Sequence, residues 1–526
     1  MEKRLLLGID IGTSGCKLTV FDFDGRVLAG AAGTYPTAHP APGWVEQDAE
    51  QWWTVVRREL RGLMTGAPVD PRAIAAIGID GTSWACLPVD ASGKPLRPAL
   101  LWLDRRAEAQ AAWLREQFGA AELSAVSGNP VDPAYITPKI LWLKEREPQI
   151  YRQTRRFLQS NAYIGFKLTG AYSQDYSQGY GFHFFEIAKG DWSEELAEKM
   201  GISLEVLAPL VHCHEVIGTV TRSAAEETGL IPGIPVVAGG LDAACCTLGA
   251  GVIRPGQTQE QGGQAGGMSI QLERPLVHPR LILGYHVLPG QWLLQGGTVG
   301  GGGALRWFNE QLGGFEQELG RQLGRSSFEW MSEAAATVPP GADGLLFLPY
   351  MAGERSPLWN SKARGVFFGL SYDKTRAHLI RAVMEGVGYS LLHNLETARE
   401  AQATVEQLVS VGGSANSAVW TQIKADITGK VIRVPFSDHA TTLGAALLAG
   451  VGTGVYPDFE TAVGRTVRVQ RTYTPDPARH AVYQEFYQLY RELYHQLVGC
   501  YDRLDAIVRS TADLMKEQNV SEGASS

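Results

Sequence analysis

Short apolar runs separated by sharp polar turns open the chain. The first run begins at Leu5 and delivers Asp10, the second covers Leu18 to Phe21, and the third extends from Arg26 to Thr34. The turns between them are Gly12-Thr13-Ser14-Gly15 and Asp22-Phe23-Asp24-Gly25. Gly-Thr and Asp-Gly turns between apolar runs are typical of β-hairpins. The pattern therefore predicts two successive hairpins, with a carboxylate beside the first turn.

Longer segments with helical or strand-like spacing of apolar residues follow the hairpins. Apolar residues at helical spacing between Trp44 and Met64, behind Asp48 as a possible cap, predict a helix, and residues 107–196 are rich in helical patterns. Strand-like runs occur at Ile74 to Ile79, Ala99 to Leu103 and Val236 to Ala238. A helix rich in Ala and Cys is expected after the last of these.

The same order of elements then begins again. Strand-like runs cover Thr258 to Leu272, Leu281 to Val287 and Trp292 to Thr298, and a helix is expected from about Ala304. Strands at 344–348, 407–411 and 431–434 then alternate with helices at 374–401, 417–428 and 441–450. Such alternation predicts α/β domains with largely parallel sheets. Two similar halves of this kind would face each other across a deep cleft.

Gly and Pro cluster at residues 249–256, which places a domain boundary there. The predicted domains are residues 1–250, residues 251–455, and a C-terminal segment of residues 456–526. In that segment, aromatic residues at helical spacing between Arg479 and Ile507 predict an amphipathic helix. The aromatic stripe favours core packing over a binding face, and the polar stretch from Lys516 to Ser526 is expected to fray.

Composition narrows the class of protein. The 526 residues are 44% hydrophobic and 19% charged, with a net charge of −8, which is typical of a soluble globular protein and argues against general nucleic-acid or membrane binding. Six cysteines without C-x-x-C spacing, no signal-like start and no apolar run of about 20 residues favour a cytoplasmic setting. A homodimer is compatible with these features.

The first turn is a candidate anion site. Gly-rich turns direct several backbone N–H groups into one small space, and Thr13 and Ser14 add hydroxyl donors. Asp10 beside the turn would hold a hydrated Mg²⁺ that bridges to a phosphate. An ordinary hairpin with an exposed Asp is an equally good interpretation of this stretch alone.

Two further Gly-rich turns precede predicted helices. Gly296 to Gly303 contains four consecutive glycines before a helix, and helix N-termini with glycines suit phosphates. Gly412-Gly413-Ser414-Ala415-Asn416 also lies between a strand and a helix, and could pack against an adenine and ribose. The chain has no G-x-x-x-x-G-K-[ST] motif and no strand followed by G-x-G-x-x-G, so neither a P-loop nor a dinucleotide site is predicted.

Polar residues at predicted strand ends supply candidate chemistry. Asp242 follows a strand amid small residues, where it could act as a general base towards a hydroxyl that attacks phosphorus. A helix N-cap is the alternative role for Asp242. The strand ends at Asp80-Gly81-Thr82-Ser83-Trp84 and Asp104-Arg105 could bind a polyol, and a structural role is as well supported for each residue singly.

At these residues the chain resembles the FGGY family of carbohydrate kinases, and within it the xylulokinase branch. The resemblance extends from Leu5 to about Gly454. The matching pieces are Asp10 to Lys17, Lys139-Ile-Leu-Trp142, Gly239-Gly-Leu-Asp242, Gly353-Glu-Arg-Ser-Pro357, Gly365-Val-Phe-Phe-Gly-Leu370 continuing to Glu385, and Gly412-Gly-Ser414. Their order makes the set specific.

The resemblance implies a duplicated actin-like ATPase (ribonuclease H-like) fold and a sugar kinase that uses ATP and Mg²⁺. The sugar would lie in the cleft on the first domain, with Asp242 as the catalytic aspartate, and MgATP would bind mainly to the second. The implied first-domain phosphate loop contains Asp10, Gly12, Thr13, Ser14 and Lys17. The implied ATP contacts in the second domain are Gln264, Gly297, Thr298, Gly302, Arg306, Gly412, Gly413, Ser414 and Asn416.

The chain departs from the family pattern at three places, two of which bear on the sugar and one, at Gly263-Gln264, on a nucleotide contact. Met-His after Ser-Gly-Gln at the sugar site is replaced by Asp80 to Trp84, an Asn after the catalytic Asp by Ala243, and a Gly-Thr by Gly263-Gln264. D-Xylulose, converted to D-xylulose 5-phosphate, is the expected substrate. Ribulose, gluconate, erythritol or a signalling hydroxyketone are alternatives, and an actin-like ATPase or a sugar sensor are alternatives from other classes.

Overall fold

The first half of the chain is built on the sheet that the opening hairpins predict. The computed structural model describes residues 4–66 and 69–523. Strands β1, β2 and β3 are antiparallel neighbours, and β1 is parallel to β5 on its other side. The sheet order is β13-β14-β5-β1-β2-β3, with β15 also paired to β5. Its strands are β1 (Leu5–Ile11), β2 (Gly15–Asp22), β3 (Val27–Thr34), β5 (Ile74–Gly81), β13 (Val216–Thr219), β14 (Pro235–Val237) and β15 (Gly240–Leu241).

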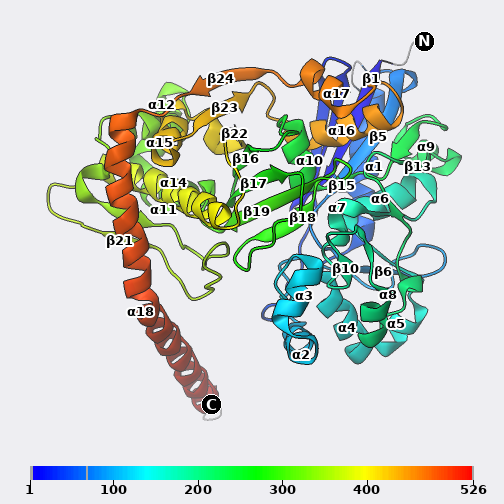
Figure 1. The fold of residues 1–526 in the computed structure, drawn as a ribbon, viewed down its shortest axis with the longest axis horizontal. Coiled ribbons are helices and arrows are strands. Elements are labelled where there is room, and N and C mark those ends of the chain that lie inside the picture. The colour runs from blue at the N-terminus through cyan, green and yellow to red at the C-terminus, as the bar shows by residue number, and fades with distance from the viewer. Residues whose placement is uncertain (1–3, 67–68, 524–526) are drawn as a thin grey trace.

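The second half repeats this arrangement with a sheet ordered β18-β19-β17-β16-β22-β23-β24. The run from Thr258 to Leu272 was predicted as a single strand, and this is wrong: a glycine-rich turn divides it into β16 and β17, which pair antiparallel. Figure 1 shows the two halves side by side. The strands are β16 (Gln257–Gly262), β17 (Gly266–Leu272), β18 (Ile282–Tyr285), β19 (Trp292–Thr298), β22 (Gln407–Val411), β23 (Val431–Pro435) and β24 (Val469–Tyr473).

Helices cover the sheets, and the first half also contains several short strands that pair in twos. In residues 4–249 the helices are α1 (Ala49–Gly66), α2 (Glu108–Phe118), α3 (Ala120–Ser127), α4 (Ile136–Arg146), α5 (Pro148–Gln153), α6 (Ser160–Thr169), α7 (Tyr176–Gly179), α8 (Glu194–Lys199), α9 (Arg222–Thr228) and α10 (Asp242–Gly249). The small strands are β4 (Glu46–Gln47), β6 (Leu87–Val89), β7 (Ala99–Leu100), β8 (Arg156–Leu158), β9 (Gln174–Asp175), β10 (Phe185–Glu186), β11 (Asp191–Trp192) and β12 (Leu210–Val211). The first predicted helix thus begins at Ala49, after Asp48, and not at Trp44.

The second half carries longer helices. They are α11 (Gly302–Leu312), α12 (Gly314–Leu323), α13 (Ser327–Ala336), α14 (Arg376–Glu400), α15 (Ala418–Thr428), α16 (Ala440–Gly452), α17 (Phe459–Thr466) and α18 (Pro477–Gly523), with the strand pair β20 (Leu346–Leu348) and β21 (Val366–Phe368). The alternation of helix and strand that the sequence predicts is therefore present in both halves.

Helix α16, from the second half of the chain, packs on the first sheet and on α10. The approach is so close that a Cβ atom on any of four glycines would overlap backbone atoms across the contact. The overlaps would be with Thr442, Ala445, Ala440 and Cys245, from glycines Gly8, Gly78, Gly249 and Gly444 respectively. This glycine seam joins the two halves.

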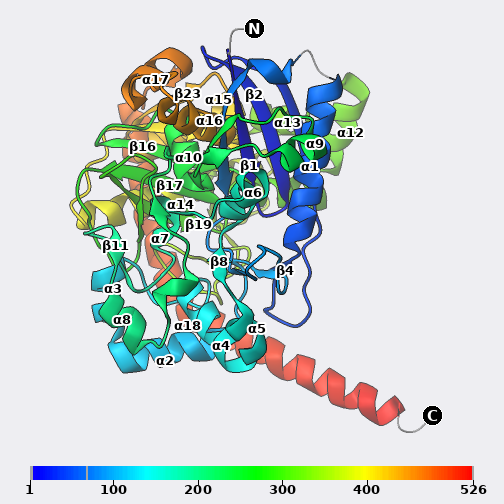
Figure 2. The same cartoon turned by 90° about the vertical axis from the view of Figure 1, so that its right-hand side faces the viewer.

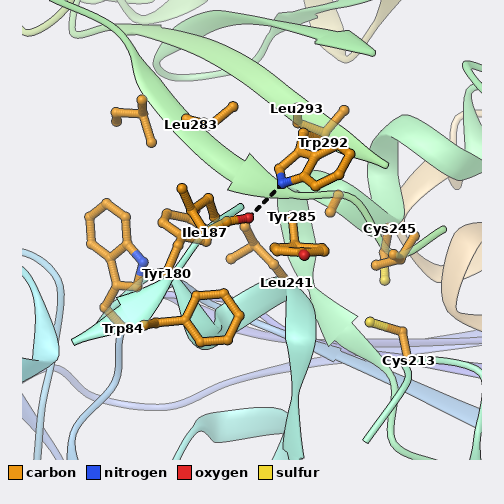
Figure 3. Close-up of a cluster of buried hydrophobic side chains, with 14 of the residues drawn as sticks. Trp84, Tyr180, Ile187, Cys213, Leu241, Cys245, Leu283, Tyr285, Trp292 and Leu293 are labelled. Atoms are coloured by element: carbon orange, nitrogen blue, oxygen red, sulfur yellow. Dashed lines mark hydrogen bonds between the residues drawn. The ribbon is translucent and has the colours of Figure 1, made fainter. Parts of the chain in front are cut away.

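Apolar side chains also join the halves, as Figure 3 shows. Trp84, Tyr180 and Leu241 come from the first half and belong to one buried cluster with Leu283 and Trp292 of the second. The Trp292 indole N–H donates a hydrogen bond of 2.9 Å to the carbonyl oxygen of Ile187. The core is therefore continuous across the junction.

The C-terminal helix α18 confirms the interpretation of the aromatic stripe as core packing. Tyr483, Tyr487 and Tyr490 are buried against Tyr389 of α14. The helix then leaves the body of the molecule, as both views show (Figures 1 and 2). It remains helical to Gly523 through most of the stretch expected to fray, and residues 524–526 lie outside the described residues. None of the helices in the described residues is long and apolar enough to cross a membrane.

Candidate active site

Three aspartates meet at the carboxyl ends of the central strands in the first half. Asp10 of β1 lies opposite Asp80 of β5 in the parallel register, and Gly240 of β15 is also paired with Asp80. Asp242 follows β15 directly as the first residue of α10. Because the carboxyl ends of parallel strands face the ligand crevice in open α/β sheets, these residues are placed for chemistry.

Burial raises the pKa of all three carboxyl groups, and the charge of Asp10 adds to the shift at Asp242 and at Asp80. Burial raises the pKa of Asp242 to about 7, and the nearby charge of Asp10 adds to the shift. Asp80 is fully buried, and neither carboxyl oxygen has a hydrogen-bond partner within the described part of the chain. Burial, followed by the charges of Asp10 and Asp242, raises the pKa of Asp80 well above its ordinary value. Asp242 is therefore poised to accept a proton near neutral pH.

A single carboxylate of the cluster, and not the three together, fits a magnesium ion that is also held by phosphate oxygens. Mg²⁺ in phosphoryl-transfer sites binds one or two carboxylates, several waters and substrate phosphates. No group of three or more His, Cys, Asp or Glu side chains in residues 4–66 and 69–523 could hold a metal ion. Asp10, half-buried beside the first Gly-rich turn, is the carboxylate that would share such an ion with a phosphate.

The first Gly-rich turn is held in shape by hydrogen bonds at both ends. The Gly12 amide donates to the Gly15 carbonyl at 3.0 Å, and the Tyr35 hydroxyl donates to the Gly12 carbonyl. The Gln47 amide nitrogen donates to the Thr13 carbonyl at 2.6 Å. Ser14 is exposed at the tip of the turn.

Lys17 is exposed on β2, directly opposite Asp10 in the strand ladder. Its positive charge partly offsets the effect of burial on the Asp10 pKa. Thr13, on the turn, places its Oγ1 at 3.2 Å from both the Thr82 hydroxyl and the Trp102 indole nitrogen. The turn is thus connected to the strand end at Thr82, one residue before Ser83.

Trp84 forms part of an aromatic wall beyond Asp80 and Ser83. Its ring stacks on Tyr135 with centroids 4.1 Å apart, and its backbone has a φ of +51°. The buried Lys139 Nζ donates to the Trp84 carbonyl at 2.9 Å, and burial lowers the pKa of Lys139 to about 7. A buried amine with a lowered pKa and a tryptophan with a strained backbone mark this wall as more than ordinary core.

Asp104 and Arg105 have partners in the structure. Asp104 is fully buried in an ion pair with Arg106 at 2.7 Å, and it also accepts a hydrogen bond of 2.6 Å from the Val45 amide. Arg105 is half-exposed and pairs with Asp132. These contacts give both side chains a structural role, and their predicted contact with a sugar stays a prediction.

A cavity of about 680 Å³ in the second half collects most of the predicted nucleotide contacts. It is large enough for a nucleotide. The predicted residues that line it are Gln264, Gly302, Arg306, Gly413, Ser414 and Asn416. Gly412 adjoins this wall in a left-handed conformation, with φ of +89°. Gly297 and Thr298 do not line the cavity, and lie in β19 instead.

The glycine run before α11 differs from the expectation in one respect. The amides of Gly302 and Gly303 donate to the carbonyls of Gly263 and Gln264 at 2.8 and 2.9 Å. A Cβ on Gly301 would overlap the backbone of Ala265. Close packing of two turns therefore accounts for part of the run, and two N–H groups of this helix start are already used.

Ser414 is fixed from behind by a buried ion pair. The Lys424 Nζ lies 2.9 Å from the Ser414 Oγ and 2.8 Å from a carboxylate oxygen of Glu260, and both charged side chains are buried. Ser410 also hydrogen-bonds to Glu260. The pair holds the Gly412–Ser414 turn at the cavity edge.

Several residues at the cleft and cavity were missed from the sequence. The opposite wall of the cavity comes from α13 and the turn before it, including Arg325, Phe328 and Ser332. Glu354, which is buried, and Arg355, which is half-buried, were quoted only as matching residues without a role. The helical pattern of residues 327–336 carries no signal that it faces a ligand, because its apolar side packs on α14 as any surface helix does.

Comparisons with known proteins decide the family. The family model described as "FGGY family of carbohydrate kinases, N-terminal domain" matches residues 5–249, and the corresponding C-terminal domain model matches residues 269–453. The chain belongs to the FGGY family of carbohydrate kinases. The predicted family and the predicted α/β fold of two halves are both confirmed, and sugar kinases of this family use ATP.

Relatives of this FGGY kinase span nearly its whole length. A xylulose kinase of Staphylococcus epidermidis is 31% identical over 498 residues, which cover 94% of this chain and 97% of the relative. A gluconokinase of Bacillus subtilis is 30% identical over 468 residues, covering 88% and 91%. The crystal structure of xylulose kinase from Rhodospirillum rubrum matches with a TM-score of 0.85 at 31% identity, covering 95% of this chain and 100% of that one.

Proposed function

We propose that this sugar kinase transfers the terminal phosphoryl group of ATP to a ketopentose, D-xylulose, and forms D-xylulose 5-phosphate. The observation that carries the proposal is the position of Asp242, whose pKa is raised to about 7 beside Asp10 and Asp80 at the strand ends. The similarity to xylulose kinases over nearly the full length supports the choice of sugar.

In the proposed reaction, Asp242 accepts the proton of the sugar hydroxyl as its oxygen bonds to the γ-phosphorus. As this bond forms, the bond between the γ-phosphorus and the bridging oxygen breaks, and ADP leaves. Asp10 would hold Mg²⁺, which neutralises charge on the phosphates when it is bound. Thr13 and Ser14 of the first turn contribute donors to the transferred group, and Lys17 adds positive charge.

The sugar would occupy the first half against the wall formed by Ser83 and Trp84, with Asp80 behind it. The nucleotide would occupy the 680 Å³ cavity of the second half. Between them, the two halves exclude water, which limits transfer of the phosphoryl group to water.

A screen of coupled ADP release tests the substrate. D-Xylulose, D-ribulose, gluconate and erythritol are compared at equal concentration with MgATP, and D-xylulose is expected to give the highest kcat/KM. Gluconate is the second candidate, because a gluconokinase is similar at 30% identity. A higher kcat/KM for gluconate than for D-xylulose would replace the proposed sugar, and ADP release that no sugar stimulates would contradict a sugar kinase.

The rate should depend on pH through Asp242. Its raised pKa means that the carboxyl is protonated, and unable to accept a proton, below about pH 7. We therefore expect kcat/KM to fall about tenfold for each pH unit below that value and to level off above it. The acidic neighbours of Asp242 are Asp10 and Asp80. A pH profile of kcat/KM without an acidic limb between pH 5 and 7 would contradict the role of Asp242 as the proton acceptor.

Asn416→Ala is expected to weaken ATP binding selectively. The residue lines the nucleotide cavity and is exposed to it, so the loss of one neutral hydrogen bond should raise KM for ATP by about 2- to 10-fold. Gln422→Ala is the matched control, because Gln422 lies on the following helix α15, is bonded to Asp426 and does not line the cavity. An equal rise in the KM for the sugar would argue against a nucleotide contact.

A further inference from the structure

Arg355 belongs to the second half of the chain, and its side chain faces the first half. Its guanidinium carbon lies 5.2 Å from the centre of the Trp102 ring. Burial lowers the pKa of Arg355, and this effect is opposed by Glu354 and by Tyr135 and Asp132, the last two from the first half. Arg355 therefore lies at the junction where the sugar side and the nucleotide side meet.

The guanidinium lies between the two Gly-rich segments. A Cβ atom added to Gly297, at the end of β19, would be 2.9 Å from the Arg355 Nη2. On the other side, the Trp102 indole N–H donates to Thr13 of the first turn at 3.2 Å. A phosphoryl group that passes from the second half to the first would cross this position.

Hydrogen bonds fasten the backbone around Arg355 to β19 and the residue after it. One carboxylate oxygen of Glu354 accepts hydrogen bonds from the amides of Val299 and Arg355, at 2.7 and 2.8 Å. The Ser356 amide donates to the Gly297 carbonyl at 3.1 Å. The side chain thus projects from a fixed segment.

No hydrogen bond or ion pair is made by the Arg355 guanidinium within residues 4–66 and 69–523, although the side chain is half-buried. By contrast, Arg106 is fully buried and pairs with Asp104. A guanidinium that has lost much of its water without gaining an anion is well placed to bind one. The start of α11 has already used two amides, which leaves phosphate charge to be met elsewhere.

We propose that Arg355 is a further catalytic residue that binds the non-bridging oxygens of the γ-phosphoryl group during transfer. The inference rests on the proposed function. In the step, the sugar oxygen bonds to phosphorus, the bond to the bridging oxygen of ADP breaks, and the hydroxyl proton goes to Asp242. Arg355 exchanges no proton and stabilises the negative charge on the equatorial oxygens.

Steady-state kinetics of Arg355→Ala and Arg355→Lys test the inference. We expect Arg355→Ala to lower kcat by about 10²-fold while the KM for the sugar stays within about threefold, because the contact forms to the transferred group. Arg355→Lys keeps the charge and should lose less. Arg364→Ala is the control, since Arg364 is an exposed arginine of the same segment that donates to backbone carbonyls.

Calorimetry of ATP and ADP binding distinguishes a contact between Arg355 and the γ-phosphate from a merely structural role of Arg355. Arg355→Ala should weaken the binding of ATP and leave the binding of ADP unchanged, because only ATP carries the γ-phosphate. An equal loss for both nucleotides, or an unchanged kcat, would overturn the inference, and a raised sugar KM alone would make Arg355 a sugar contact instead. If Arg355→Ala does not fold, Arg355→Lys is used, and an ATP affinity equal to that of the unmodified chain together with full kcat overturns the proposal.

The two proposals fail in different ways. If the unmodified chain phosphorylates no sugar, the proposed function fails. The comparison of ATP with ADP affinity needs no sugar, so it still decides whether Arg355 contacts the γ-phosphate.

Discussion

Asp242→Asn should lower kcat by about 10³-fold, within the range for a positioned proton acceptor. Asparagine keeps the size of the side chain but cannot accept the hydroxyl proton. Because burial already disfavours the charged form of Asp242, the neutral amide should not lower the melting temperature. Steady-state kinetics with the preferred sugar, together with ATP binding by calorimetry, measure the effect. ATP binding should remain nearly intact.

Asp458→Asn is the matched control for this variant. Asp458 also lies at the start of a helix, where it accepts a hydrogen bond of 2.7 Å from the Thr461 amide, but it is exposed and far along the chain from the cluster. The kcat of Asp458→Asn should remain that of the unmodified enzyme. If Asp242→Asn turned over within about threefold of the unmodified chain, it would lose far less than a general base contributes, and the role assigned to Asp242 would be wrong.

Lys424→Met should destabilise the second half by about 3–5 kcal/mol, which is typical when one partner of a buried ion pair is removed. The carboxylate of Glu260 would be left buried without its cation, and the Ser414 hydroxyl would lose a partner 2.9 Å away. Urea unfolding measures the loss of stability. The KM for ATP should rise as well, because Ser414 lines the nucleotide cavity.

A double variant separates the buried charge from the loss of packing. Glu260→Leu combined with Lys424→Met removes both charges, and much of the stability should return, since apolar replacement of a buried pair is often neutral. Lys362→Met breaks an exposed pair with Asp502 and should change stability by less than about 1 kcal/mol. If the double variant were as unstable as Lys424→Met, the uncompensated charge would not be the cause.

Local patterns in the sequence predicted the fold well where turn chemistry and periodicity agreed. The Gly-Thr and Asp-Gly turns after Asp10 and Asp22 led to the correct antiparallel strands, because these turns admit few other conformations. The alternation of strands and helices beyond Gln407 was equally clear in the sequence. The run from Thr258 to Leu272 was predicted as one strand, although the glycines between Gln261 and Met268 mark the turn that divides β16 from β17.

The site was predictable only where a residue's role follows from its position after a strand. Asp242 and Asp10 could be recognised in that way, and the structure brings both together with Asp80. The ion pair of Asp104 could not, because its partner Arg106 is a charged residue two positions away that gives no sign of burial in the sequence. Arg355 depends on the docking of one half against the other, and no local pattern describes that contact.

The glycine seam limits how this enzyme can be rebuilt from parts of its relatives. A chimera that joins the first half of one kinase to the second half of another would pack an α16 of different sequence against α10 and the first sheet. Since Gly444 and Gly78 leave no space for a methyl group, even an alanine in the incoming partner would force backbones apart. Because α10 begins with Asp242, the misfit would reach the reactive carboxylate within two helical turns.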